Sequence, residues 1–297
     1  MSDKTCKAPD PNTRTPAYRM PPGACDAHCH VFGPADRFPY APDRAYTPPD
    51  APYEGLVELH RILGIERAVI VHASCHGSDM RVTLDAIARS GGAMRGVAVV
   101  DPGVTDADLA ALDAGGIRGV RFNFVKHLGG MPDMAFFDRV LAQVEPLGWH
   151  VVLHLDAEDV VELAPRIARI RAPFVIDHMG RPDVTQPVDG PEFGRFLRFV
   201  EHNDVWVKVS CPERLTVTGP PALDGERNAY TDVVPFARRV VTEFPDRVLW
   251  GTDWPHPNIA GDMPNDGDLV DLFAQVTQDE GLRRQVLVAN PARLYWA

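Results

Sequence analysis

Acids and histidines end three short apolar runs in this sequence. The strings are DAHCH at 26–30, VIDH at 175–178 and WGTD at 250–253. Two histidines at i and i+2 project from one face of a strand, so His28 and His30 can point together into one cavity. His178 and Asp253 join them if their strands lie side by side. Imidazoles beside a carboxylate move protons or bind metals, so this spacing predicts polar chemistry at strand ends.

The elements that must position these groups follow a repeating pattern. Short β-rich segments are expected at about 24–28, 67–73, 95–100, 117–123, 149–155, 173–178, 205–210 and 247–252. Most are nearly continuous apolar runs, which are typical of strands buried on both faces of a parallel sheet. Helix-like stretches separate them at 82–89, 106–114, 136–144, 160–170, 194–200 and 233–244. These β/α alternations predict an α/β protein with a single (β/α)8 TIM-type barrel rather than a doubly wound sheet.

The barrel domain is expected over residues 23–297, after a polar, Pro-rich N-terminal arm over 1–22. The arm lacks the apolar core of a signal peptide. Pro-rich 34–53 is expected to be an ordered loop over the barrel mouth, and 216–230 a second insertion at the same end. Residues 290–296 are expected to close the barrel with packed aromatic side chains.

Composition excludes several classes of partner. The formal net charge is −11, which opposes binding to nucleic acid or to an anionic membrane surface. No apolar run approaches the roughly 20 residues of a membrane helix. The five cysteines have no CxxC spacing, so reduced thiols are expected. We expect a cytoplasmic protein whose partner is a small molecule.

Five longer motifs resemble the metal-independent lactonase branch of the amidohydrolase superfamily. They are DAHCHVFGP at 26–34, SCHGSD at 74–79, GVRFNF at 119–124, IDHMGRPD at 176–183 and LWGTDWPHPN at 249–258. They occur in the family's order, and the similarity extends from about residue 18 to 296. Within this branch they are most similar to the lactonases of 2-pyrone-4,6-dicarboxylate.

The resemblance implies hydrolysis of a planar anionic lactone, most closely 2-pyrone-4,6-dicarboxylate, to 4-oxalomesaconate in aromatic-compound catabolism. Asp253 is then the general base that activates water, and His28, His30 and His178 surround the carbonyl. The residues support this interpretation independently, because ester hydrolysis needs an activated water and a stabilised oxyanion. Polar residues at several strand ends are hard to explain as satisfied core groups, since barrel active sites lie there.

Substrate carboxylates need cations, because burying an unpaired carboxylate is costly and Arg forks match carboxylates bidentately. Arg121, near the end of the fourth predicted strand, and Arg214, just beyond the seventh, are the leading candidates. The resemblance places binding residues at both positions. Lys126, just downstream of Arg121, is a further candidate. His127 stands where the resemblance implies a second arginine, so this chain departs from the pattern at one carboxylate contact.

Four more residues are candidate substrate contacts near the same mouth. Tyr46 from the Pro-rich loop, with Ser74 and His76 from the SCHG turn, could hydrogen-bond the ring or its substituents. Tyr46 could equally anchor its own loop. Arg181 is a candidate cation, although a structural ion pair explains this residue as well.

The same residues leave a metal alternative open. One Zn²⁺ could be held by His28, His30, His154, His178 and Asp253, because imidazoles and a carboxylate are familiar zinc ligands. His154 ends the fifth predicted strand, where the resembled pattern carries a tyrosine, so it is a candidate for contact with substrate or with metal. The end of the fourth strand offers no bridging Lys or Glu for a second ion. The resemblance favours an enzyme with no required metal or other cofactor.

Other functions remain in view. A 4-sulfomuconolactone hydrolase would use the same cationic pocket, and the departures at His127 and His154 leave room for a sulfonate. A zinc-dependent decarboxylase of the same superfamily is the alternative from another class. A non-catalytic carboxylate-binding barrel would not explain an uncommitted base such as Asp253 opposite three histidines. The sequence leaves the oligomeric state open.

Overall fold

The computed structural model describes residues 5–125, 130–219, 230–259 and 261–297. Eight strands form one sheet in chain order, and each strand is parallel to its neighbours. The strands are β1 Cys25–Cys29, β2 Arg67–Val71, β3 Met94–Ala98, β4 Ile117–Asn123, β5 His150–His154, β6 Phe174–Ile176, β7 Trp206–Val209 and β8 Val248–Trp250. All the predicted strands are therefore confirmed, with ends that differ by no more than two residues.

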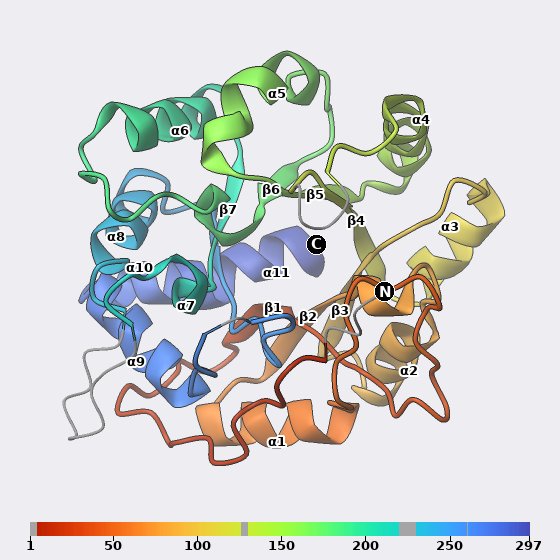
Figure 1. Ribbon diagram of the computed structural model, residues 1–297, viewed down its shortest axis with the longest axis horizontal. Coiled ribbons are helices and arrows are strands. Elements are labelled where there is room, and N and C mark those ends of the chain that lie inside the picture. Colours follow the sequence, from red (N-terminus) through yellow and green to blue (C-terminus); the bar gives the residue numbers. More distant parts are fainter. Residues whose placement is uncertain (1–4, 126–129, 220–229, 260) are drawn as a thin grey trace.

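Helices surround the strands, as Figure 1 shows. They are α1 Tyr53–Leu63, α2 Arg81–Arg89, α3 Asp106–Ala114, α4 Met134–Val144, α5 Val160–Ile167, α6 Pro191–His202, α7 Pro212–Leu215, α8 Val234–Glu243, α9 Asp266–Val276, α10 Glu280–Arg284 and α11 Asn290–Tyr295. The alternation of parallel strands with outer helices confirms the single (β/α)8 barrel. Within the described parts of the chain, no helix is long and apolar enough to cross a membrane.

The interior of the barrel is filled mainly by valines from several strands, including Val69, Val97 and Val152. Tyr295 from α11 joins this cluster and packs edge-on against His150, with ring centroids 4.8 Å apart. Since His150 begins β5, α11 covers the amino ends of the strands. The prediction that the C-terminal aromatics close the barrel is confirmed, and the opposite end is left for chemistry.

Hydrogen bonds just beyond the strand ends join the first and last strands. The Asp253 amide donates to the His28 carbonyl at 2.8 Å, and the His30 amide donates to the Trp254 carbonyl at 2.7 Å. The side chain of Asp26 reinforces this seam by accepting from both the amide and the hydroxyl of Thr252. The seam therefore places Asp253 directly against the two histidines of β1.

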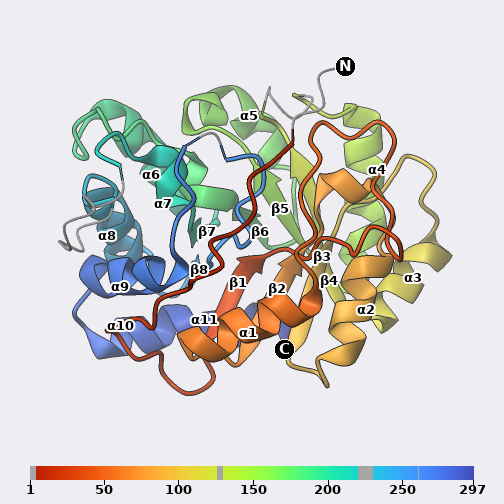
Figure 2. The ribbon, with the colours of Figure 1, turned by 60° about the horizontal axis from the view of Figure 1, so that its bottom comes forward.

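The N-terminal segment, dark red in Figure 2, runs along the loop that follows β8 and along α9. The Lys7 ammonium donates to the Gly261 carbonyl, and the Asn265 side chain donates to Asp10. The backbone at Thr5 forms a parallel bridge with Thr47 in the first barrel loop. The segment thus ties together two loops at the barrel mouth.

Candidate active site

A cavity of about 430 Å³ opens at the carboxyl ends of the strands. The barrel brings nine of the predicted site residues to its wall: His30, Tyr46, Ser74, Arg121, His154, His178, Arg181, Arg214 and Asp253. They come from segments that are far apart in the sequence but adjacent around the barrel. This end of the barrel is where enzymes of this fold carry their active sites.

Asp253 is the most tightly held group on the cavity wall. Its Oδ1 lies 3.3 Å from His28 Nε2 and 3.2 Å from His30 Nε2, and its Oδ2 accepts from Arg214 Nη2 at 2.9 Å. Burial raises the pKa of Asp253, but the Arg214 guanidinium and the His30 hydrogen bond outweigh burial and hold it well below its ordinary value. The carboxylate is therefore ionised and paired, not uncommitted as the sequence suggested.

Two further histidines on the cavity wall have defined partners. His30 Nδ1 lies 2.7 Å from the Val71 carbonyl, and because a carbonyl only accepts, Nδ1 carries a proton. Its Nε2 lies 3.2 Å from Asp253 Oδ1, and because an ionised carboxylate only accepts, Nε2 donates in this hydrogen bond. His178 Nδ1 lies 2.8 Å from Ser210 Oγ. Burial, with His28 beside it, lowers the pKa of His178 to about 3, so this ring is neutral near pH 7.

His28 lies beneath the cavity and not on its wall. Its side chain is fully buried, with Nδ1 3.1 Å from Lys208 Nζ and 3.3 Å from Asp177 Oδ1. Burial and the Lys208 ammonium lower the pKa of His28 to about 3. His28 does not line the cavity and lies 3.3 Å from Asp253, which does, so the expected contact of His28 with a substrate carbonyl stays a prediction.

Three arginines on the cavity wall each face an acid. Arg121 Nε donates to Asp177 Oδ2 at 2.8 Å, and Arg181 Nε lies 3.3 Å from Asp156 Oδ1. A guanidinium carries five N–H groups in a fixed fork, so one bond to an acid leaves other donors for a second anion. Together with Arg214 they give the cavity a local positive character in a chain of net charge −11.

Strained backbone is concentrated where the last three strands meet the cavity. His178, Cys211 and Asp253 have φ values of 53°, 56° and 66°. Residues with a Cβ rarely adopt this left-handed region, and such outliers cluster at functional sites. Gly251 has another role, since a Cβ there would lie 2.6 Å from the backbone nitrogen of His28. Only glycine permits the close approach of β8 to β1 at this point.

Comparison with known proteins places this geometry in a family. The family profile described as Amidohydrolase matches residues 25–296, almost the whole chain. The chain belongs to the amidohydrolase family. The family membership inferred from the five motifs is therefore confirmed.

Curated relatives of this amidohydrolase act on lactones. A 2-pyrone-4,6-dicarboxylate hydrolase from Comamonas testosteroni is 54% identical over 286 residues, covering 96% of this chain and 94% of the relative. A 4-sulfomuconolactone hydrolase from Hydrogenophaga intermedia is 42% identical over 293 residues, covering 98% and 94%. A solved structure from Acinetobacter baumannii, assigned as a 2-pyrone-4,6-dicarboxylic acid hydrolase with citric acid bound, superposes with a TM-score of 0.78 at 26% identity and covers 93% of this chain and all of its own.

The donor set of this amidohydrolase fits a metal ion poorly. Ligand atoms of His28, His178 and Asp253 do lie within 4.8 Å of one another. However, Arg214 Nη2 lies 2.9 Å from Asp253 Oδ2, so an ion bound to this carboxylate would stand beside a guanidinium. Lys208 supplies a second positive charge, 3.1 Å from the far nitrogen of His28. Arg214 and Lys208 therefore already supply positive charge beside this cluster.

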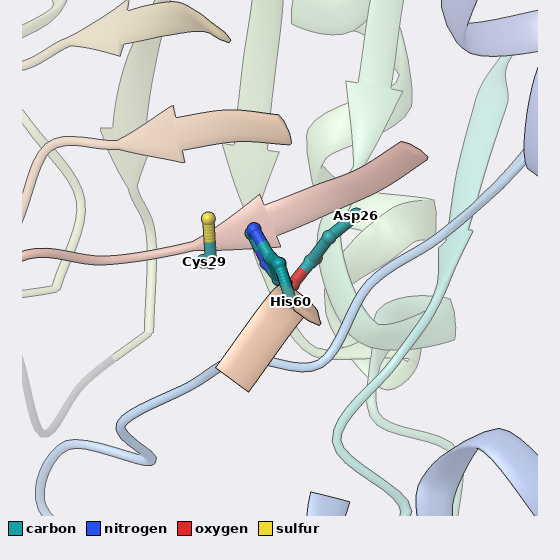
Figure 3. Close-up of side chains that lie close together, drawn as sticks. All are labelled: Asp26, Cys29 and His60. Atoms are coloured by element: carbon teal, nitrogen blue, oxygen red, sulfur yellow. The ribbon is translucent and has the colours of Figure 1, made fainter. Parts of the chain in front are cut away.

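A second acid and histidine cluster lies on the outer face of β1, where Figure 3 shows Asp26, Cys29 and His60. Their ligand-type atoms also lie within 4.8 Å of one another. Asp26 Oδ2 accepts from His60 Nε2 at 3.2 Å and from Thr252 Oγ1 at 2.6 Å, while Cys29 Sγ donates to the Val69 carbonyl. Burial raises the pKa of Cys29 well above its ordinary value, which disfavours the thiolate that a metal needs. The cluster is a structural clamp.

Among the predicted substrate contacts, the structure places His76 away from the cavity wall. Its Nδ1 lies 3.2 Å from the Pro39 carbonyl, its ring packs against Tyr40, and it does not line the cavity. Ser74 and His76 belong to one 3₁₀ turn, in which side chains two positions apart point in different directions. Lys126 and His127 lie outside the described residues.

The sequence interpretation missed two groups beneath the cavity and one on its wall. Lys208 and Asp177 are fully buried and contact each other, with Lys208 Nζ 3.2 Å from Asp177 Oδ1. Glu213 lines the cavity beside Arg214. A signal for Lys208 was available, because it is the one charged residue in the apolar run VWVKV at 205–209. A lone buried charge needs a partner, but the sequence does not say which strand supplies it.

Proposed function

We propose that this amidohydrolase opens the ring of 2-pyrone-4,6-dicarboxylate to give 4-oxalomesaconate. The observation that carries the proposal is one cavity in which an ionised Asp253 lies beside the imidazoles of His30 and His178, with arginines around it. The 54% identical relative from Comamonas testosteroni carries this activity in its name. The solved relative from Acinetobacter baumannii holds citrate, a tricarboxylate, which supports a site for multiply charged anions.

In the proposed reaction, water adds to the lactone carbonyl carbon as Asp253 takes one of its protons. His30 Nε2, 3.2 Å from Asp253 Oδ1, holds the carboxylate in place beside this water. The carbonyl oxygen becomes an oxyanion, and His178 stabilises it when the Ser210 hydroxyl donates to Nδ1 and leaves a proton on Nε2. The ring carbon–oxygen bond then breaks, the leaving oxygen receives the proton held by Asp253, and the enol product converts to the oxo acid.

In this proposal, the arginines bind the two carboxylates of the substrate. Arg121 is committed to Asp177 through Nε, so its remaining donors can meet one carboxylate. Arg214 already binds Asp253 and the Pro257 carbonyl, so a substrate carboxylate would compete for its donors. Tyr46, Ser74 and His154 line the same cavity and can supply neutral hydrogen bonds.

A 4-sulfomuconolactone is the second candidate substrate, supported by the 42% identical relative from Hydrogenophaga intermedia. A sulfonate and a carboxylate both accept hydrogen bonds from arginine, so the geometry of the cavity serves either group. We propose no required metal for either reaction, since the charge of Asp253 is met by Arg214. The unpaired thiols and the net charge of −11 agree with a cytoplasmic enzyme that does not bind nucleic acid.

The test is turnover of three purified lactones by the full chain: 2-pyrone-4,6-dicarboxylate, 4-sulfomuconolactone and an uncharged 2-pyrone. We expect kcat/KM to be highest for the dicarboxylate, with chromatographic measurement of the ring-opened acid as the readout for all three lactones. A higher value for the sulfonated lactone would transfer the proposal to the second substrate. Equal, low turnover of all three would overturn the proposal that this cavity is built for anionic lactones.

A further inference from the structure

Lys208 is a fully buried lysine in the middle of β7 that lies outside the cavity wall. Its Nζ lies 3.1 Å from His28 Nδ1 and 3.2 Å from Asp177 Oδ1. Burying an ammonium is costly unless it is paired and hydrogen-bonded. The Asp177 carboxylate provides the pair, which leaves the contact with His28 to be explained.

The direction of the hydrogen bond between Lys208 and His28 follows from the chemistry of the two groups. An ammonium has three donors and no lone pair, so His28 Nδ1 must accept. Asp177 Oδ1 lies farther from the same nitrogen, at 3.3 Å, and its other oxygen accepts from Arg121. A neutral imidazole that accepts at Nδ1 carries its proton on Nε2.

We propose that Lys208 is a positioning residue that locks His28 in the Nε2-protonated tautomer. His28 Nε2 lies 3.3 Å from Asp253 Oδ1 and has no hydrogen bond of good geometry to any described residue, so a proton there faces the base. The two histidines of β1 are held by different groups at Nδ1. His30 donates its Nδ1 proton to the Val71 carbonyl, whereas His28 Nδ1 faces the Lys208 ammonium.

This tautomer has a consequence for metal binding. A histidine nitrogen coordinates a metal through a lone pair, so a protonated Nε2 cannot act as a ligand. Lys208 thereby removes His28 from the ligand-like set while leaving it able to donate to the base. The tautomer is independent of the proposed lactone substrate, and only the kinetic part of the test below rests on that function.

The direct test is ¹⁵N NMR of the full chain labelled in its 11 histidines, with His28 assigned by comparison with His28→Gln. We expect the wild-type His28 Nε2 to show the shift of a protonated nitrogen and Nδ1 that of an unprotonated one. In Lys208→Met, Nδ1 becomes free to donate to Asp177, so this pattern should be lost. Arg61→Met, which removes an exposed cation from α1, is the matched control and should keep the wild-type pattern.

Removing one charge of a buried pair can prevent folding, so Lys208→Met with Asp177→Leu, which removes both members of the pair, provides a second variant. Finding Nδ1 protonated in the wild type, or the wild-type pattern in either folded variant, would overturn the proposal. In folded Lys208→Met we expect kcat to fall about tenfold with KM unchanged, as for other groups that orient a reacting side chain, and zinc affinity to rise because Nε2 can then present a lone pair. If the wild type shows the tautomer but no lactone turnover, the proposed function fails and the role of Lys208 stands.

Discussion

The two faces of β1 carry clusters of similar composition with different surroundings. On the inner side, His28 lies with His178 and Asp253, and on the outer side Asp26 lies with Cys29 and His60. A register irregularity separates them, because three residue steps on β1 match two on β2. Asp26 and His28 therefore point to opposite faces, although strict alternation would place them on the same one.

The two clusters differ in how fully their polar atoms are hydrogen-bonded and in whether they reach the cavity. Both side-chain oxygens of Asp26 accept hydrogen bonds from protein groups, and no member of the outer cluster lines the cavity. The inner cluster opens to the cavity through Asp253, and His28 Nε2 lacks a hydrogen-bond partner among the described residues. A group of acids and histidines indicates a reaction site when polar atoms remain for a substrate, and a clamp when none remain.

The largest effect is expected from Asp253→Asn. Loss of the general base should lower kcat for 2-pyrone-4,6-dicarboxylate by roughly 10²–10⁴-fold. The matched change in the outer cluster is Asp26→Asn, which should lower kcat far less and should instead reduce the free energy of unfolding by about 1–3 kcal/mol. Steady-state kinetics and urea unfolding of both folded variants test the pair, and near-normal turnover by Asp253→Asn would remove Asp253 from the proposed mechanism.

The next largest effect is expected from Arg121→Met. An unpaired substrate carboxylate should cost about 2–5 kcal/mol in kcat/KM for the dicarboxylated lactone, and an uncharged 2-pyrone should lose much less. The ratio of the two kcat/KM values separates recognition from general damage, including damage from the loss of the Asp177 bond. An unchanged ratio would make Arg121 structural. Arg214→Met is less specific, because Arg214 also binds Asp253.

A third effect concerns pH. The pKa of Asp253 is held well below its ordinary value by Arg214 against the effect of burial, so Asp253 stays ionised as the pH falls. We expect kcat/KM to show no acid limb from about pH 8 down to about pH 5. In Arg214→Met, burial acts without the guanidinium, so the acid limb should move to higher pH. An acid limb at the same pH in both proteins would show that the ion pair does not set the protonation of Asp253.

The smallest effect on catalysis is expected from His60→Gln in the outer cluster. His60 donates to Asp26 from α1 and has no contact with the cavity, so kcat should stay within about twofold while stability falls by about 1 kcal/mol. Thermal unfolding and kinetics of the same preparation test this separation. A large loss of kcat with unchanged stability would give the outer cluster a catalytic role and end the distinction between the two faces.

The strands could be predicted from the sequence because a buried parallel strand carries a continuous apolar run that needs no long-range information. The predicted helices did not include α1 and α9. For α1 the signal was present, since Leu56, Leu59, His60 and Leu63 have helical spacing and are buried. In α9 nearly every residue is buried, so an amphipathic pattern is weak. Nothing in the residues DAHCH at 26–30 predicts the register irregularity of β1.

The wall of the cavity could be predicted because barrel residues at strand ends share one mouth. The sequence could not predict which of these side chains already have hydrogen-bond partners, because the partners come from distant strands across the barrel. Arg214 pairs with Asp253 across two strand ends, and Lys208 meets His28 from a strand 180 positions further along the chain. His76 was placed on the wall because it shares a turn with Ser74, and the pitch of that turn sends it elsewhere.

In the proposed mechanism, Asp253 and its histidines hydrolyse the lactone without a metal ion. The most direct measurement is turnover of 2-pyrone-4,6-dicarboxylate by the full chain after dialysis against a chelator, with the metal content of the same sample determined by mass spectrometry. The account predicts full activity at substoichiometric metal content, and no increase when zinc is added. Loss of activity on chelation, with recovery at about one equivalent of zinc, would contradict the account and make His28, His154 and Asp253 candidate ligands.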